Sequence, residues 1–288
     1  MKTLQHRIQQ ATRASRVNQI VVERDYAQAY VLAGIAGRAE LVDTLVFKGG
    51  TALKKIYFGS YRFSEDLDFS AVDGPRGQDL EQEVRVAIDA AQAAARELAP
   101  VGMTVERYEE RDPHPGGQEA FIVRVQFPWQ RQPMVKVKIE ITHDEPVLLP
   151  APRRPVLHGY DEPLATAVRT YGLEEIASEK LRSTRQTQAR LATRGWARSR
   201  ARDYFDLWHL VQLPDGRIDW AKVTEVLPRK CALRDVAITS VADVFEEALL
   251  GEVRATWERT LGPFVPELPD VEAVLAETRE RLERLLKL

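Results

Sequence analysis

The chain has 288 residues and one cysteine, Cys231, which excludes a disulfide framework and any cysteine-rich metal site. No stretch approaches the apolar length of a membrane-spanning helix, and the opening residues MKTLQHRIQQ lack the apolar core of a signal peptide. The net charge is only −2, so the composition as a whole does not indicate a nucleic-acid partner. With 44% hydrophobic residues the chain can bury a full core, and we expect a cytoplasmic protein without a membrane partner.

Acidic residues are missing from one segment. Between Lys180 and Arg202 the sequence has eight basic residues and no acidic one. A solvated helix surface is the ordinary interpretation of such a run. This run, however, has no interleaved Glu for i,i+4 ion pairs, and it contains Trp196, a side chain on which a base can stack. We therefore predict an anionic polymer as partner, with these residues as nucleic-acid-binding candidates: Arg185, Arg190, Arg194 and Arg198.

A glycine turn is the first motif that carries chemistry. Residues 47–69 read FKGGTALKKIYFGSYRFSEDLDF, in which Gly49 and Gly50 follow a short apolar run. Two glycines let a backbone approach a phosphate closely, and a helix that begins near Thr51 points its free N–H groups at the same place. A phosphate-binding turn is the function that this pattern favours.

Two carboxylates, Asp66 and Asp68, end the same segment. In a strand, residues two apart share a face, so both side chains project into one small volume. Their repulsion is tolerable chiefly if a cation lies between them, and Mg²⁺ prefers carboxylate oxygens and keeps positions open for water and phosphate. A D-x-D on a surface strand is by itself common, and the preceding glycine turn is what makes the metal interpretation strong.

The remaining pattern predicts an α+β chain in two parts. Helical spacing over residues 16–38, a short strand at 45–47 and an Ala-rich helix at 80–98 precede two alternating strands at 121–127 and 135–141. A Pro-rich stretch between Pro146 and Pro163 reads as an interdomain connection. Beyond it the pattern is helical, at about 173–194, 198–212, 219–227, 234–249 and 270–287.

The second of the two alternating strands places Lys136, Lys138 and Glu140 on the face opposite its apolar residues. Alone, this would be a solvent-exposed Lys/Glu face. The family resemblance described next implies a third metal-binding carboxylate on a neighbouring strand, for which Glu140 is the candidate and Asp144, beyond the expected strand end, a weaker one.

The segment Lys48–Leu53 followed by Arg62–Phe69 resembles the signature of the AbiEii/AbiGii nucleotidyltransferase toxins, which reads approximately K-G-G-T-x-L and then R-x-S-x-D-L-D-F. Two helical segments are similar to further elements of that family. Residues 175–181 resemble its lysine-bearing helix, and 202–207 resemble its R-D-x-x-D-L helix. The resemblance covers residues 20 to 212 in four ordered motifs.

The resemblance implies a polymerase-beta-like mixed sheet with flanking helices over residues 1–160. A helical domain over 161–288 would contribute Lys180 and Asp203 to the site. It implies a toxin of a toxin–antitoxin or phage-defence system that moves a nucleoside monophosphate from an NTP to the 3′ end of tRNA. The reaction would depend on Mg²⁺ or Mn²⁺, would block aminoacylation, and would be restrained by a cognate antitoxin.

The same resemblance assigns roles to individual residues. The metal would be held by Asp66, Asp68 and Glu140, and the catalytic set would be Asp66, Asp68, Lys180 and Asp203. The nucleotide would be bound by Lys48, Gly49, Gly50, Thr51 and Ser64.

Two other functions fit the motifs. Such a site could nucleotidylate or phosphorylate a protein hydroxyl, on the antitoxin or on the chain itself, where Ser60 and Ser64 lie close in sequence. Alternatively the chain could sense a nucleotide without catalysis, although a pure binding module has no need for clustered carboxylates. The motifs do not specify the nucleotide, the acceptor, the oligomeric state or the role of the last 75 or so residues.

Overall fold

The structure is a computed structural model that describes residues 2–109, 117–196 and 198–288. The chain forms two compact units, which divide between Tyr171 and Gly172. Each unit has its own core. Among the described residues, no helix is both long and apolar enough to cross a membrane.

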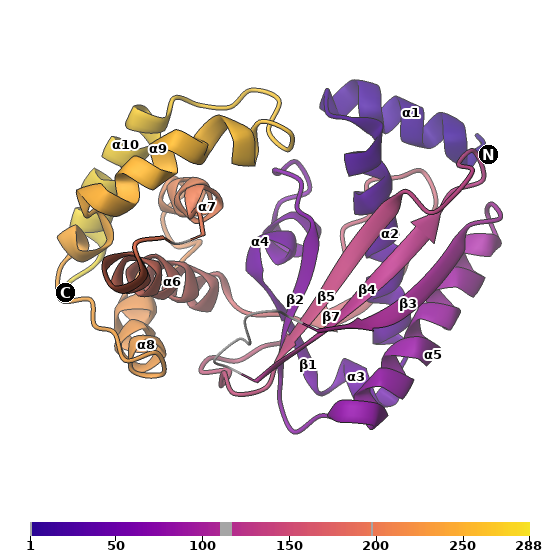
Figure 1. Cartoon of the computed structure of the whole chain (residues 1–288), viewed down its shortest axis with the longest axis horizontal. Coiled ribbons are helices and arrows are strands. Elements are labelled where there is room, and N and C mark those ends of the chain that lie inside the picture. The colour runs from indigo at the N-terminus through magenta and orange to yellow at the C-terminus, as the bar shows by residue number, and fades with distance from the viewer. Residues whose placement is uncertain (1, 110–116, 197) are drawn as a thin grey trace. The chain divides into compact units, whose positions relative to one another are not determined.

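The first unit is built on a mixed sheet (Figure 1). Its helices are α1 (Leu4–Ser15), α2 (Gln19–Ala36), α3 (Ala39–Val42), α4 (Gly49–Ala52), the π-helical η1 (Leu53–Tyr57) and α5 (Gly77–Arg96). Its strands are β1 (Leu45–Lys48), β2 (Asp66–Ala71), β3 (Gly102–Tyr108), β4 (Gln118–Gln126), β5 (Val135–Thr142), β6 (Arg153–Pro155) and β7 (Ala167–Arg169).

Five strands form the main sheet in the order β1-β2-β5-β4-β3. Strands β2 and β5 are parallel, and the other neighbouring pairs are antiparallel. This mixed sheet, together with the helices, confirms the predicted α+β class. Strand β3 was not predicted, because its residues MTVERY carry no clear alternation of apolar and polar side chains.

One face of the sheet is the core. The alternating apolar side chains of β4 and β5 are all buried, as the period of two predicts. Helix α2 packs on β5 and helix α5 packs on β3, and the two helices also pack on each other (Figure 1). The polar side chains of the same strands therefore lie on the opposite face.

The Pro-rich stretch belongs to the first unit. Its residues 153–155 form β6, which pairs with β7. The chain then runs along β1, where the Tyr171 backbone N–H donates to the Phe47 carbonyl over 3.0 Å and the Tyr171 hydroxyl lies 2.8 Å from the Ser70 hydroxyl. These bonds explain why the first unit extends to Tyr171 and beyond the Pro-rich stretch.

The second unit is helical. It consists of α6 (Leu173–Arg194), α7 (Ala201–Val211), α8 (Trp220–Ala232), the 3₁₀ helix η2 (Val241–Val244), α9 (Glu247–Leu261) and α10 (Val271–Leu285). The helices predicted at 173–194, 198–212, 219–227 and 270–287 are confirmed, with ends shifted by up to five residues. The helix predicted at 234–249 is wrong. Asp243 accepts hydrogen bonds from the backbone of Thr239 and Ser240, which closes a tight capped turn where a continuous helix was expected.

The packing of α2 on α5 depends on a glycine. A Cβ atom added to Gly34 would lie 2.1 Å from the Ala87 carbonyl oxygen, so no larger residue fits without moving a helix. We expect Gly34→Ala to lower the free energy of unfolding by about 1–3 kcal/mol, the usual range for overpacking. The free energy of unfolding of the first unit, obtained from its urea denaturation curve, tests this expectation.

Gly37→Ala is the matched control, three residues further along. Its added Cβ would lie 3.5 Å from the nearest carbonyl oxygens, an ordinary contact, so its effect should stay within about 0.5 kcal/mol. Equal destabilisation by the two variants would contradict the role of close helix packing.

Candidate active site

The carboxylates of the first unit are brought together by strand register. In the parallel pair β2 and β5, Asp68 lies opposite Glu140, and Asp66 lies opposite Lys138. Paired residues share a face, so these side chains project together from the polar face of the sheet. The register thus places Glu140 beside the D-x-D carboxylates.

Charge repulsion is concentrated at Asp68. Burial raises the pKa of the Asp68 carboxyl well above its usual range, and the nearby carboxylates of Glu140 and Asp66 raise it further. Two lysines oppose this effect. Lys138 forms an ion pair with Glu140, and Lys48, which pairs with Asp68 across β1 and β2, lowers the pKa of Asp68.

The glycine turn packs directly against Asp68. Gly49 has φ +77°, a backbone conformation that favours glycine, and a Cβ atom there would lie 2.4 Å from Asp68 Oδ2. Helix α4 begins at this residue and includes Gly50 and Thr51. The Thr51 hydroxyl donates to the backbone carbonyl of Asp66, so the turn is tied to the start of β2.

Three other polar residues near the turn lie as follows. Lys48 is buried, and its Nζ is 3.5 Å from a Glu145 carboxylate oxygen. Ser64 is half-buried two residues before Asp66, and its carbonyl accepts a hydrogen bond of 3.2 Å from Gln28. Lys55 follows the turn closely in sequence, but its Nζ forms a buried ion pair of 2.7 Å with Asp25.

The donor chemistry fits a hard divalent cation, since Asp66, Asp68 and Glu140 offer only carboxylate oxygens. Among the residues that the structure describes, no three acidic, histidine or cysteine side chains converge on a metal-binding position. The ion pair of Glu140 with Lys138 holds that carboxylate in its present orientation. Asp144, the weaker candidate, is exposed and lies 3.8 Å from Arg76.

The second unit carries a separate charged cluster. Lys180 on α6 contacts two carboxylates of α7, with Nζ 3.0 Å from Asp203 Oδ1 and 2.5 Å from Asp206 Oδ2. Arg200 also lies 3.1 Å from Asp203. Burial alone would raise the pKa of the Asp203 carboxyl, but Lys180 and Arg200 outweigh it and hold that pKa below its usual range.

Asp206 was not assigned a role from the sequence, although its spacing of three from Asp203 places both on one helical face. Its side chain is 0% exposed, and the ion pair with Lys180 stabilises its charge. Glu175, in the lysine-bearing segment, is likewise fully buried and lies 2.7 Å from Lys230 of α8. Glu175 therefore anchors α6 to α8 and does not face solvent.

The basic run divides into two parts. Arg185 contacts the Ala237 carbonyl and Glu246, both at 3.0 Å, so it is engaged within the unit. From residue 189 to 196 the side chains of α6 and its end are half-buried or exposed, and Trp196 is 62% exposed. We call the four residues Arg190, Arg194, Trp196 and Arg198 the α6 tip.

A comparison with protein families matches residues 30–283 to the nucleotidyl transferase AbiEii toxins of type IV toxin–antitoxin systems. Among solved structures, the nucleotidyltransferase toxin MenT4 of Mycobacterium tuberculosis has the same fold, with a TM-score of 0.67 and 23% identity. The similarity covers 94% of this chain and 85% of MenT4. The comparison with curated proteins found no match.

The family match spans most of the chain and contains both the carboxylates of β2 and the charged cluster of α6 and α7. The four sequence motifs, at residues 48–53, 62–69, 175–181 and 202–207, all lie within the matched range. The chain belongs to the AbiEii family of nucleotidyltransferase toxins of type IV toxin–antitoxin systems.

Proposed function

We propose that this protein transfers a nucleoside monophosphate from an NTP to the 3′ end of tRNA, in the cytoplasm and under the control of a cognate antitoxin. The observation that carries the proposal is the placement of Asp68 and Glu140 in register beside the Gly49 turn. Carboxylates next to a phosphate-binding turn suit nucleotidyl transfer, in which positioning and charge neutralisation dominate.

In this proposal Asp66, Asp68 and Glu140 would hold Mg²⁺ or Mn²⁺. When bound, such an ion neutralises negative charge on the phosphates. The backbone N–H groups at the start of α4, from Gly49 to Thr51, bind the triphosphate. Lys48 adds a positive charge beside them, and Ser64 supplies a hydroxyl near the start of β2.

In the reaction, one phosphorus–oxygen bond forms and another breaks. The oxygen of the acceptor hydroxyl attacks the α-phosphorus and its proton passes to solvent water, while the bond from that phosphorus to the β-phosphate oxygen breaks and pyrophosphate leaves with the electron pair. As the family resemblance implies, Lys180 would neutralise charge on the triphosphate as a compact cation. Asp203 stays ionised because its pKa is lowered, so it suits the task of positioning Lys180 better than that of a general base.

The proposal for RNA rests on the α6 tip. An exposed tryptophan among arginines without an interleaved carboxylate offers one stacking surface and several phosphate contacts. Arg194 and Arg198 are exposed and Arg190 is half-buried. Arg185, which is engaged with Glu246, is the weakest of the four predicted RNA contacts.

Labelled NTPs, Mg²⁺ and either total tRNA or the protein alone test the proposal directly. Label in the RNA fraction supports it. Label in the protein fraction would assign the transfer to a protein hydroxyl, and no label in either fraction with each of the four NTPs would contradict both.

The first variant tests the carboxylate site. Asp68→Asn should lower transfer by at least about 100-fold, because it removes charge that the reaction needs. Its melting temperature without metal should not fall. A carboxyl whose pKa is raised by folding contributes stability only while protonated, so at neutral pH Asn loses none of it.

Asp144→Asn is the matched control at the far end of β5, where the exposed carboxylate pairs only loosely with Arg76. It should keep the wild-type rate. Near-normal turnover by Asp68→Asn would rule out the metal assignment.

The second pair of variants tests the α6–α7 cluster. Asp203→Ala and Lys180→Ala should each lower transfer by at least about 100-fold. Asp203→Ala is the cleaner variant, because Lys180 keeps Asp206 as a partner. Lys180→Ala removes an ion-pair partner of the buried Asp206, which destabilises the fold, so its rate must be measured where circular dichroism shows it folded.

Lys222→Ala serves as control, since this lysine is 57% exposed and pairs with Asp219 near the start of its own helix. Folded Asp203→Ala with wild-type turnover would remove the cluster from the mechanism.

The third variant tests the α6 tip. Changing Arg190, Arg194 and Arg198 to Glu should weaken RNA modification while Mg²⁺–nucleotide affinity stays nearly intact. Each lost phosphate contact should reduce the slope of log affinity against log salt by about 0.7–0.9. RNA affinity at several salt concentrations measures this.

The same charge change on α10, with Arg279, Arg281 and Arg284 replaced by Glu, is the control and should leave the salt slope unchanged. If the tip variant kept both its RNA affinity and its slope, the tip would be a solvated surface and a protein acceptor would become the better hypothesis.

A further inference from the structure

A hollow lies in the first unit beside the ends of β2 and β5. It has a volume of about 510 Å³ and is bounded by the loop after β2, by the residue after β5 and by the Pro-rich stretch. That volume is within the range of small-molecule sites. Ala71 lines it at the end of β2, three residues or about 10 Å along the strand from Asp68. The residues that line it include none of those assigned to the candidate active site.

One wall is apolar and contains Pro146, Leu149 and Pro150. The polar lining is mostly cationic, with Arg76 and Arg169 against one exposed acid, Asp73. Apolar walls with a few convergent polar groups are the usual composition of a ligand site.

Arg169 is oriented by the backbone. Its Nη1 donates to the Asp43 carbonyl and its Nε lies 3.5 Å from the Ala151 carbonyl. Within the described chain it makes no ion pair with a carboxylate. Arg76 has only the 3.8 Å contact with Asp144, and both of these side chains are more than half exposed. Two guanidinium groups at one hollow thus keep most of their capacity to bind an anion.

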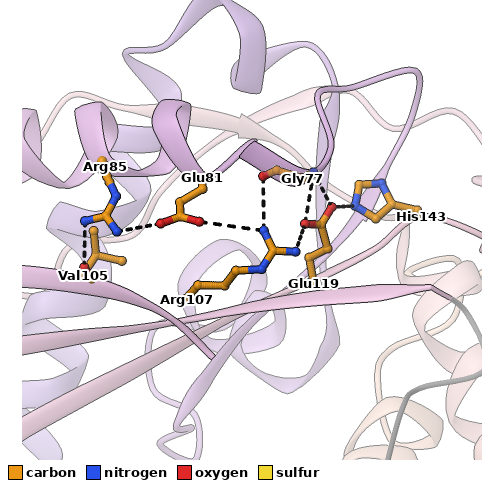
Figure 2. A network of polar contacts seen from close by, with 7 residues as sticks. All are labelled: Gly77, Glu81, Arg85, Val105, Arg107, Glu119 and His143. Carbon is orange, nitrogen blue, oxygen red and sulfur yellow. Dashed lines mark hydrogen bonds and ion pairs between the residues drawn. The ribbon is translucent and has the colours of Figure 1, made fainter. Parts of the chain in front are cut away.

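His143 is the third polar group, and Figure 2 shows how it is held. Its Nε2 lies 2.9 Å from Glu119, which also accepts from Arg107 over 2.5 Å and from the Gly77 backbone N–H over 3.1 Å. Burial, and then the charge of Arg76, lowers the pKa of His143, so the ring is neutral near pH 7.

Because Glu119 accepts, Nε2 carries the proton and Nδ1 is an acceptor. Nδ1 has no hydrogen-bond partner in the part of the chain that the structure describes. The side chain as a whole is 3% exposed. Glu119 fixes the ring at the wall of the hollow and also ties β4 to the start of α5, so Nδ1 can accept a hydrogen bond from a ligand bound there.

We propose that this hollow binds a small organic anion, whose phosphate or carboxylate is held by Arg76 and Arg169 while a hydroxyl or amino group donates to His143 Nδ1. Its apolar part lies on the Pro146, Leu149 and Pro150 wall.

Amide NMR shifts of the full chain, titrated with inorganic phosphate or with acetate at constant ionic strength, test the site. We expect saturable shifts at Gly74 and Ala151. Arg169→Gln should weaken binding by at least about tenfold, which corresponds to about 1.4 kcal/mol, the size of one charge-assisted hydrogen bond. Saturation by phosphate alone would indicate a phosphorylated ligand, and saturation by both anions a carboxylate as well.

Two further variants separate binding from folding. Arg76→Gln changes an exposed side chain that makes no capping bond to α5, and it should also weaken binding. Arg153→Gln is the control, because Arg153 lies opposite Arg169 and contacts Asp43 but does not line the hollow. Its affinity should equal that of the wild type.

Three results would overturn the proposal. They are the absence of saturable shifts with both anions, equal affinity in Arg76→Gln, Arg169→Gln and the wild type, and shifts confined to Gly49 and Gly50. The last would place the anion at the glycine turn only.

Discussion

The repulsion among Asp66, Asp68 and Glu140 is the constraint on which the first unit depends. Strand register, set by the buried apolar faces of β2 and β5, forces Asp68 opposite Glu140, and the Asp68 carboxyl responds with a raised pKa. A folded protein tolerates such a cluster of carboxylates when positively charged groups lie nearby. Lys138 and Lys48 supply part of that charge. The cluster is costly for stability, which favours our proposal of a role toward a cation and phosphates over a purely structural role.

The glycine turn follows from the same constraint. A side chain at Gly49 would collide with Asp68, so the turn and the carboxylate can share this volume only if the turn has no Cβ. The positive φ of Gly49 and the start of α4 then bring backbone N–H groups to the place where negative charge is most concentrated. Backbone N–H groups and carboxylates thus lie side by side, an arrangement that would suit a metal-bound triphosphate.

Much of this site could be predicted from sequence because the signals are local. The D-x-D spacing, the Gly-Gly turn and the alternation around Glu140 each depend on a strand or turn period, and a single register joins them. The Lys180 cluster was also predictable in part, since Asp203 shares a helix face with Asp206. The neutralisation of Glu140 by Lys138 was not, because both residues belong to the same polar face and only side-chain orientation decides whether they pair.

Features that depend on contacts between residues distant in sequence could not be predicted. Lys55 follows the glycine turn in sequence, and only tertiary packing shows that it is buried against Asp25. The Pro-rich stretch reads as a connection, yet β6 pairs with β7 and keeps it in the first unit. The hollow beside His143 is made by three segments far apart in sequence, none of which carries a motif. When the residues of a site lie within one strand or turn, their spacing in the sequence predicts which side chains share a face. When a site is formed by loops that are distant in sequence, only the folded chain shows which residues line it.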